Sequence, residues 1–85
     1  MMNILKQITK DREGNDCWIY ETFAVVKSNE TLFLVHHEKV TGYFGNESMN
    51  SMIIGNKEEL RNLLGNYELN ATEIDYLCEK SWEFE

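Results

Sequence analysis

The residues of this chain best suited to chemistry are the run His36-His37-Glu38 and two cysteines, Cys17 and Cys78. Imidazole and thiolate groups bind metals and serve as bases or nucleophiles. Adjacent residues of a strand point to opposite faces, so the two imidazoles would share a metal only if a remote carboxylate or Cys78 completed the site. We therefore expect one histidine to face water and the other to lie beside a sheet residue such as Glu21. No catalytic residue, metal site or cofactor is predicted.

The cysteines also favour a structural role. They are the only two in the chain and have neither CxxC nor Cys/His metal spacing, which indicates a reduced, intracellular protein. No secretory signal and no apolar run of membrane-spanning length is recognisable, so a cytoplasmic location is expected. Cys78 falls on the apolar stripe of a predicted helix, where a buried thiol is inert. A small metal-binding or catalytic protein that uses the His36/His37 region remains the alternative.

The elements that would position these residues are organised around a β-hairpin over residues 17–38. Two runs rich in β-branched and aromatic residues, 17–27 and 31–38, flank the polar turn Ser28-Asn29-Glu30. Apolar residues alternate onto both faces of these strands, so both faces need a cover. Helices would cover one face. The chain's own segments are the favoured cover for the other, with a symmetry partner or a target protein as alternatives.

The segments around the hairpin are less regular. Residues 3–13 are predicted to form a short helix capped by Asn3 and ended by Gly14, with an extra strand as the alternative. Residues 40–45 could extend the second strand, Asn46-Glu47-Ser48 would form a turn, and residues 49–54 would form a third strand. The glycines near Tyr43 lack the spacing of a phosphate-binding loop.

Two capping-box patterns mark the C-terminal helices. Asn56-Lys57-Glu58-Glu59 precedes an apolar stripe that Gly65 ends, and Asn70-Ala71-Thr72-Glu73 begins a second helix expected to run to the C-terminus. The predicted fold is a single small α+β domain over residues 1–85. A three-stranded antiparallel sheet would pack with helices in the order α-β-β-β-α-α, or with a strand in place of the first helix.

Negative charge is concentrated in the second half of the chain. The formal net charge of the whole chain is −7, and residues 43–85 carry most of it. Asp75, Glu79 and Glu83 are spaced at i, i+4, i+8, so they would form an acidic row on the last helix. Such a row could occupy a Lys/Arg-lined groove in place of a nucleic-acid strand. The alternative is a solvated acidic face that only keeps the protein soluble.

In size and charge the whole chain broadly resembles the small acidic proteins of phages and mobile elements that inhibit host nucleases, including anti-CRISPR and anti-restriction proteins. The resemblance rests on no diagnostic motif and transfers no site residue. It implies a stoichiometric, non-enzymatic inhibitor or regulator of a larger protein with a basic nucleic-acid-binding surface, acting in the host cytoplasm if the chain is phage-encoded. The expected contacts are acidic residues and one aromatic residue: Glu58, Glu59, Glu68, Asp75, Tyr76, Glu79 and Glu83.

An immunity protein or antitoxin would use the same acidic surface against a cationic toxin. Direct binding to nucleic acid is not expected, because the chain has no basic patch. Membrane binding is not expected either, and a homodimer remains open.

Overall fold

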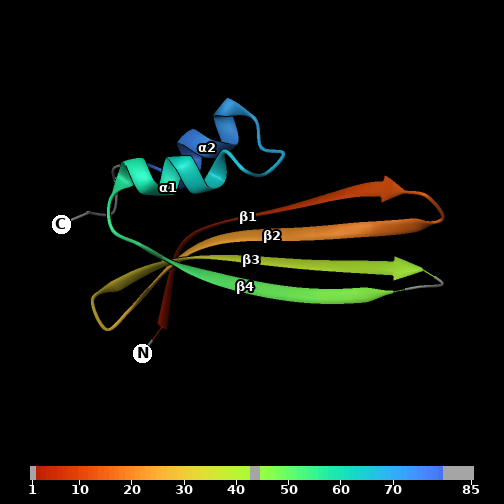
Figure 1. Cartoon of the computed structure of the whole chain (residues 1–85), viewed down its shortest axis with the longest axis horizontal. Helices are drawn as coiled ribbons and strands as arrows, with labels where there is room; N and C mark the ends of the chain where they lie inside the picture. The colour runs from red at the N-terminus through yellow and green to blue at the C-terminus, as the bar shows by residue number, and fades with distance from the viewer. Residues whose placement is uncertain (1, 43–44, 80–85) are drawn as a thin grey trace.

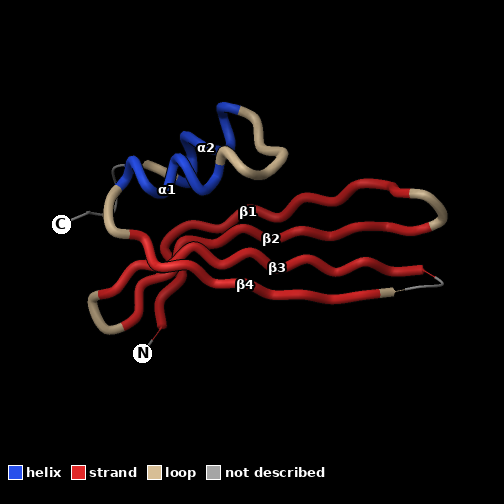
Figure 2. Tube along the Cα trace, viewed as in Figure 1, coloured by secondary structure: helices blue, strands red, loops and turns tan. Residues whose placement is uncertain are grey.

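The structure of the protein is a computed structural model, and it describes residues 2–42 and 45–79. Four long strands are followed by two short helices (Figures 1 and 2). The elements in chain order are β1 (Met2–Gly14), β2 (Cys17–Ser28), β3 (Thr31–Gly42), β4 (Asn46–Ile54), α1 (Lys57–Leu64) and α2 (Ala71–Leu77).

The strands form one antiparallel sheet in the order β1-β2-β3-β4, so each strand pairs with its neighbour in sequence. The predicted central hairpin is confirmed, and its second strand extends to Gly42. Its connection is the two-residue turn Asn29-Glu30, whose φ angles of 51° and 66° are both positive. Positive φ at both turn residues matches the right-handed twist of the flanking strands.

The predicted N-terminal helix is wrong, because residues 2–14 form the edge strand β1. A strand seemed unfavourable because Ile4 and Ile8 would share a face with Lys6. The pairing register with β2 shifts between Ile4 and Lys6, however, so Ile4 is opposite Val26 on one face while Ile8 is opposite Phe23 on the other. Pairing with β2 along the whole strand outweighs a local preference for a short helix, which is marginal in water.

The predicted sheet of three strands and the order α-β-β-β-α-α are also wrong. The order is β-β-β-β-α-α, and most of the described chain is sheet. The expected turn at Asn46-Glu47-Ser48 belongs to β4, where these residues pair with Val40, Lys39 and Glu38. Polar residues at this edge of the sheet lie exposed to water, so a turn-like composition is compatible with a strand.

Both helices pack on one face of the sheet. The apolar stripes of the helices and the apolar residues on that face together form the core. The buried core comprises Phe23, Val25, Leu34, Ile54, Leu60, Leu64, Leu77 and Cys78. We call this the helix-side face, and the opposite face the open face. Neither described helix has the length and apolar character needed to cross a membrane.

The predicted caps are present at both helices. At α2, the Asn70 side chain accepts from the Glu73 backbone N–H, and the Glu73 carboxylate accepts from the Asn70 backbone N–H. At α1, Asn56 accepts from the Glu59 N–H, but the Glu59 carboxylate reaches the Gly55 N–H instead. The prediction that the last helix runs on to the C-terminus is wrong where it can be compared, because α2 ends at Leu77 with Cys78 as its cap.

Candidate functional site

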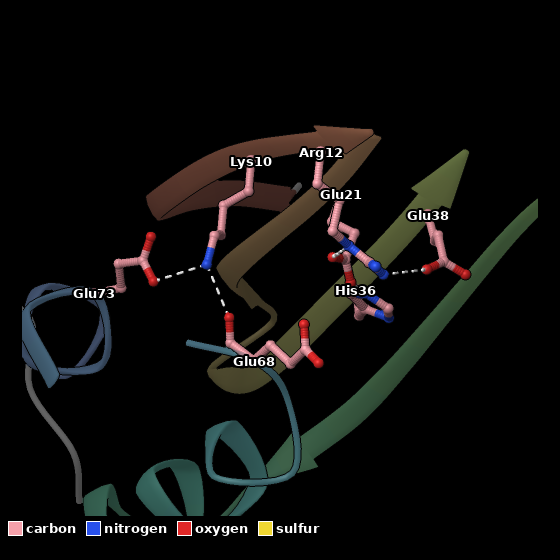
Figure 3. Close-up of polar contacts among 7 residues, drawn as sticks. All are labelled: Lys10, Arg12, Glu21, His36, Glu38, Glu68 and Glu73. Carbon is pink, nitrogen blue, oxygen red and sulfur yellow. Dashed lines mark hydrogen bonds and ion pairs between the residues drawn. The ribbon is translucent and has the colours of Figure 1, made fainter. Parts of the chain in front are cut away.

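A cluster of charged side chains lies on the helix-side face of the sheet, beside the region that the helices cover (Figure 3). Register places Lys10, Glu21 and Glu38 in one row across β1, β2 and β3. Arg12 lies one row further along, and His36 lies one row closer to the helices. The five side chains share one face. Residues directly paired across strands point to the same side of a sheet, and so do residues two apart on one strand.

His36 is the buried member of this cluster. Its side chain stacks on Phe23, with ring centroids 4.7 Å apart, and its ring lies 4.6 Å from that of Tyr67 in the segment between the helices. The imidazole Nε2 lies 3.1 Å from Glu21 Oε2. An ionised carboxylate can only accept, so the imidazole donates. His36 therefore lies beside Glu21, as expected for one of the two histidines.

Arg12 offsets part of the negative charge of the two glutamates in the cluster. Its Nε lies 3.5 Å from Glu21 Oε1, and one terminal nitrogen lies 3.9 Å from Glu38 Oε2. Glu21 thus faces His36 with one oxygen and Arg12 with the other. This arrangement resembles a base held by an orienting carboxylate, but no serine, threonine or cysteine bonds to His36 among the described side chains. The described contacts join His36, Glu21, Arg12 and Glu38 in one polar network across β1, β2 and β3.

The second histidine lies on the open face and is separated from the first by the sheet. His37 Nε2 lies 2.6 Å from Glu47 Oε2 on β4. Within the described ranges, no three His, Cys, Asp or Glu side chains converge in a way that could hold a metal ion. The adjacent histidines thus belong to two different surroundings, as their strand spacing predicts.

The cysteines do not join either histidine in a reactive pair. Cys17 begins β2, six positions from the register position of His36, which corresponds to about 20 Å along a strand. Cys78 lies in the core, and burial raises the pKa of its thiol. A thiol that stays protonated is a poor nucleophile, so the predicted inert role of Cys78 agrees with its position.

Three acidic residues of the last helical segment are paired with cations from elsewhere in the fold. Lys10 Nζ lies 3.0 Å from Glu73 Oε1 and also donates to the Glu68 backbone carbonyl at 2.8 Å. Arg61 of α1 lies 3.0 Å from Asp75. Lys6 of β1 pairs with Glu79.

These pairs alter the titration of the groups involved. The hydrogen bond to Glu79 raises the pKa of Lys6, whose ammonium group also lies 4.6 Å from the ring centroid of Tyr76. The backbone N–H of Asn70, and then Lys10, lower the pKa of Glu73. Negative charge on this side of the molecule is therefore partly compensated within the chain itself.

The expected acidic row does not form as a continuous helical stripe. Asp75 lies on α2, Glu79 follows the end of the helix, and Glu83 lies outside the described residues. Of the other expected contacts, Glu58 is exposed on α1 and Glu59 caps it, while Glu68 lies exposed between the helices. These carboxylates therefore occupy several separate parts of the helical layer.

The open face carries an exposed apolar surface that the helices do not cover. Its large exposed side chains come from β1, β2 and β4: Met2, Ile4, Trp18, Tyr20, Met49 and Ile53. The indole N–H of Trp18 donates to Asp11 at 3.2 Å, so the ring is held at the edge of this surface. The favoured expectation, that the fold's own segments cover both faces, is not met by the two described helices, which both pack on the helix-side face. The signal for the open surface was present in the sequence as apolar residues on both faces of the hairpin.

Comparison with known proteins returned no matching family model, no matching curated protein and no matching solved structure.

Proposed function

We propose that this protein is a non-catalytic, acidic interaction module that binds a larger nucleic-acid-binding protein or nuclease and inhibits or regulates it stoichiometrically. The observation that carries the proposal is the open face of the sheet, where Ile53 and Met49 are 64% and 67% exposed. Apolar side chains gathered on one exposed face of a small domain are typical of protein contact surfaces.

The aromatic residues supply the anchors of this contact. Trp18 and Tyr20 lie on one strand with ring centroids 6.5 Å apart, and they are 37% and 42% exposed. Tryptophan and tyrosine are enriched among the residues that contribute most to binding energy, because each buries a large rigid surface and can still make a hydrogen bond. The partner therefore needs an apolar patch that accepts these rings.

The charge of the chain supports a cationic partner. A formal net charge of −7 accelerates association with a cationic protein and opposes binding to nucleic acid. Glu73, Asp75 and Glu79 face cations of the same chain, whereas Glu58 and Glu68 make no ion pair with a described side chain. We propose Glu58 and Glu68 as the main acidic contacts, with Tyr76 and the remaining carboxylates at the periphery.

The test begins with capture of the partner from the native host, or from cells that express candidate nucleases. The purified partner is then assayed for nucleic-acid binding or cleavage with increasing amounts of the protein. Complete inhibition at a one-to-one ratio is the expected result. If saturating protein leaves both nucleic-acid binding and cleavage by the captured partner unchanged, the proposed inhibition is wrong.

A pair of double variants tests the acidic contacts. Glu58→Lys with Glu68→Lys adds four positive charge units, and so does the control Asp16→Lys with Glu30→Lys in the two hairpin turns, so both change the net charge from −7 to −3. All four positions are exposed. The first variant should weaken inhibition about tenfold more than the control and reduce its dependence on salt. Equal losses of inhibition in the two double variants would mean that only the total charge of the protein affects binding.

The open face is tested separately. Trp18→Ala with Tyr20→Ala, which leaves β4 unchanged, should weaken partner binding by about tenfold or more, with little change in salt dependence. Unchanged affinity would remove the sheet face from the contact. A partner that proves to be a toxin encoded beside this gene would identify an immunity protein or antitoxin instead.

A further inference from the structure

The two edges of the sheet differ in how they are protected against pairing with another strand. Edge strands present unpaired backbone N–H and C=O groups, and proteins usually block them with charges, bulges, prolines or covering segments. β1 and β4 are the two edges of this sheet. Their sequences and surroundings can therefore be compared directly.

β1 has several protective features. It contains a register irregularity between Ile4 and Lys6, and five of its residues are charged: Lys6, Lys10, Asp11, Arg12 and Glu13. Side chains of the α2 segment also bond to it, through the pairs Lys6 with Glu79 and Lys10 with Glu73. Approach of a foreign strand to this edge would disrupt these pairs.

β4 lacks these features. Its nine residues, Asn46–Ile54, contain no lysine, arginine or proline, and its register with β3 runs without a shift. The one charged side chain is Glu47 at its start, and this carboxylate turns back onto His37 of β3. In Figure 1, β4 forms the lower border of the sheet, and no helix runs beside it there. Within residues 2–42 and 45–79, this edge is therefore long, regular and uncovered.

We infer that β4 is a self-association edge, through which two copies of the chain join in antiparallel register to form one continuous eight-stranded sheet. The pattern of β4 favours a second copy over a foreign strand. On the open face, Met49 and Ile53 lie two residues on either side of Ser51. A twofold axis at Ser51 therefore places Met49 opposite the partner's Ile53, and repeats the pair on the other side.

Charge and surface are both compatible with this register. Glu47 falls opposite the partner's Gly55, so the two Glu47 carboxylates are separated by about 27 Å along the strands and do not repel each other appreciably. Ile53 continues a cross-strand row that includes Ile4, Val26 and Phe33. The partner's Met49 extends this row, and 67% of the Met49 side chain is exposed in the single chain. Pairing thus covers apolar surface as well as unpaired backbone.

The inference is tested by sedimentation equilibrium of the full chain from about 1 to about 500 μM. The wild type should associate to twice its mass of 10.0 kDa. Ser51 is exposed and lies opposite its own copy, so Ser51→Lys and Ser51→Glu each place like charges together and should raise the dissociation constant about tenfold or more. An equimolar mixture of these two variants should restore the dimer, because the opposed charges then attract.

The matched controls are Gln7→Lys and Gln7→Glu, at an exposed position of the other edge strand, β1. Neither should alter association beyond the effect of net charge. A wild type that stays monomeric over the whole concentration range would overturn the inference. So would a dimer that resists both Ser51 variants, or one that the Gln7 variants weaken equally. Far-ultraviolet circular dichroism of each variant separates loss of pairing from loss of folding. Because the readout is mass, the result is independent of the proposed inhibitory function.

Discussion

The imidazole of His36 donates to the carboxylate of Glu21 across neighbouring strands, at a distance of 3.1 Å, while its ring contacts those of Phe23 and Tyr67, which also contact each other. This relationship joins the sheet to the segment between the helices. Only 8% of His36 is exposed. A buried polar side chain of this kind stabilises a fold when its hydrogen bond is made and destabilises it when its partner is removed.

A double-mutant cycle measures the contribution of this hydrogen bond. His36→Phe retains an aromatic ring but removes the N–H donor, and Glu21→Met retains a side chain of similar length but removes the acceptor. We expect a coupling of about 1 kcal/mol between the two substitutions, measured by urea denaturation. His36→Ala should cost about 2 kcal/mol more than His36→Phe, because it also removes the ring contacts with Phe23 and Tyr67. Additive effects of the first two substitutions would contradict a direct bond between the side chains.

The ion pair and cap at Glu73 predict how stability depends on pH. The backbone N–H of Asn70 and the Lys10 ammonium hold the pKa of Glu73 below its ordinary value. A carboxyl whose pKa is lower in the folded state adds stability above its unfolded pKa, and that stability is lost as the pH falls through the folded pKa. Glu73→Gln should therefore destabilise the protein by about 1 kcal/mol at neutral pH.

The pH dependence distinguishes the charge from the cap. The difference between wild type and Glu73→Gln should shrink as the pH falls below about 4.5, because the Glu73 carboxyl is then protonated in the unfolded chain before it is protonated in the folded one. Asp75→Asn is the matched control, because the Asp75–Arg61 pair is exposed and should contribute less than about 0.5 kcal/mol. A difference for Glu73→Gln that stays constant from neutral pH to pH 3 would show that charge is not involved.

The two cysteines should react at very different rates. Cys78 is 3% exposed in the core, and burial raises the pKa of its thiol, whereas Cys17 is only partly buried at the start of β2. At neutral pH a maleimide reagent should modify one thiol of the folded protein quickly and the second only in denaturant. Mass spectrometry of the singly labelled protein should identify Cys17, and Cys17→Ser should remove the fast phase. Rapid labelling of Cys78 would contradict the packing of α2 on the sheet.

Features governed by neighbouring residues could be predicted from the sequence. The hairpin turn at Asn29 and the N-caps Asn56 and Asn70 depend on contacts within four residues, and all three are present. The existence of both helices follows from the same caps and their apolar stripes. Local hydrogen bonds and local periodicity thus determined most of the helical part of the fold.

Features that depend on distant residues were predicted poorly. β1 was mistaken for a helix because Lys6 and Lys10 lie on the same face as Ile8, and their carboxylate partners Glu79 and Glu73 are more than 60 residues away. The Lys6–Glu79 and Arg61–Asp75 pairs likewise compensate two charges of the acidic row that the sequence predicts. Periodicity describes which side chains share a face, but it does not identify the distant groups that make a charged face compatible with packing.

The hairpin turn at Asn29-Glu30 offers a stabilising substitution. Glu30 has a φ angle of 66°, a conformation that costs an ordinary residue about 1 kcal/mol and costs glycine nothing. Glu30→Gly should therefore stabilise the protein by up to about 1 kcal/mol, less the entropy that glycine gains in the unfolded chain. Glu30→Val should destabilise it, since a β-branched side chain adopts positive φ with difficulty. Thermal unfolding should give the highest midpoint temperature for Glu30→Gly, a lower one for the wild type and the lowest for Glu30→Val. If Glu30→Gly lowered the midpoint while Glu30→Val did not, the turn would have a different backbone conformation from the one described.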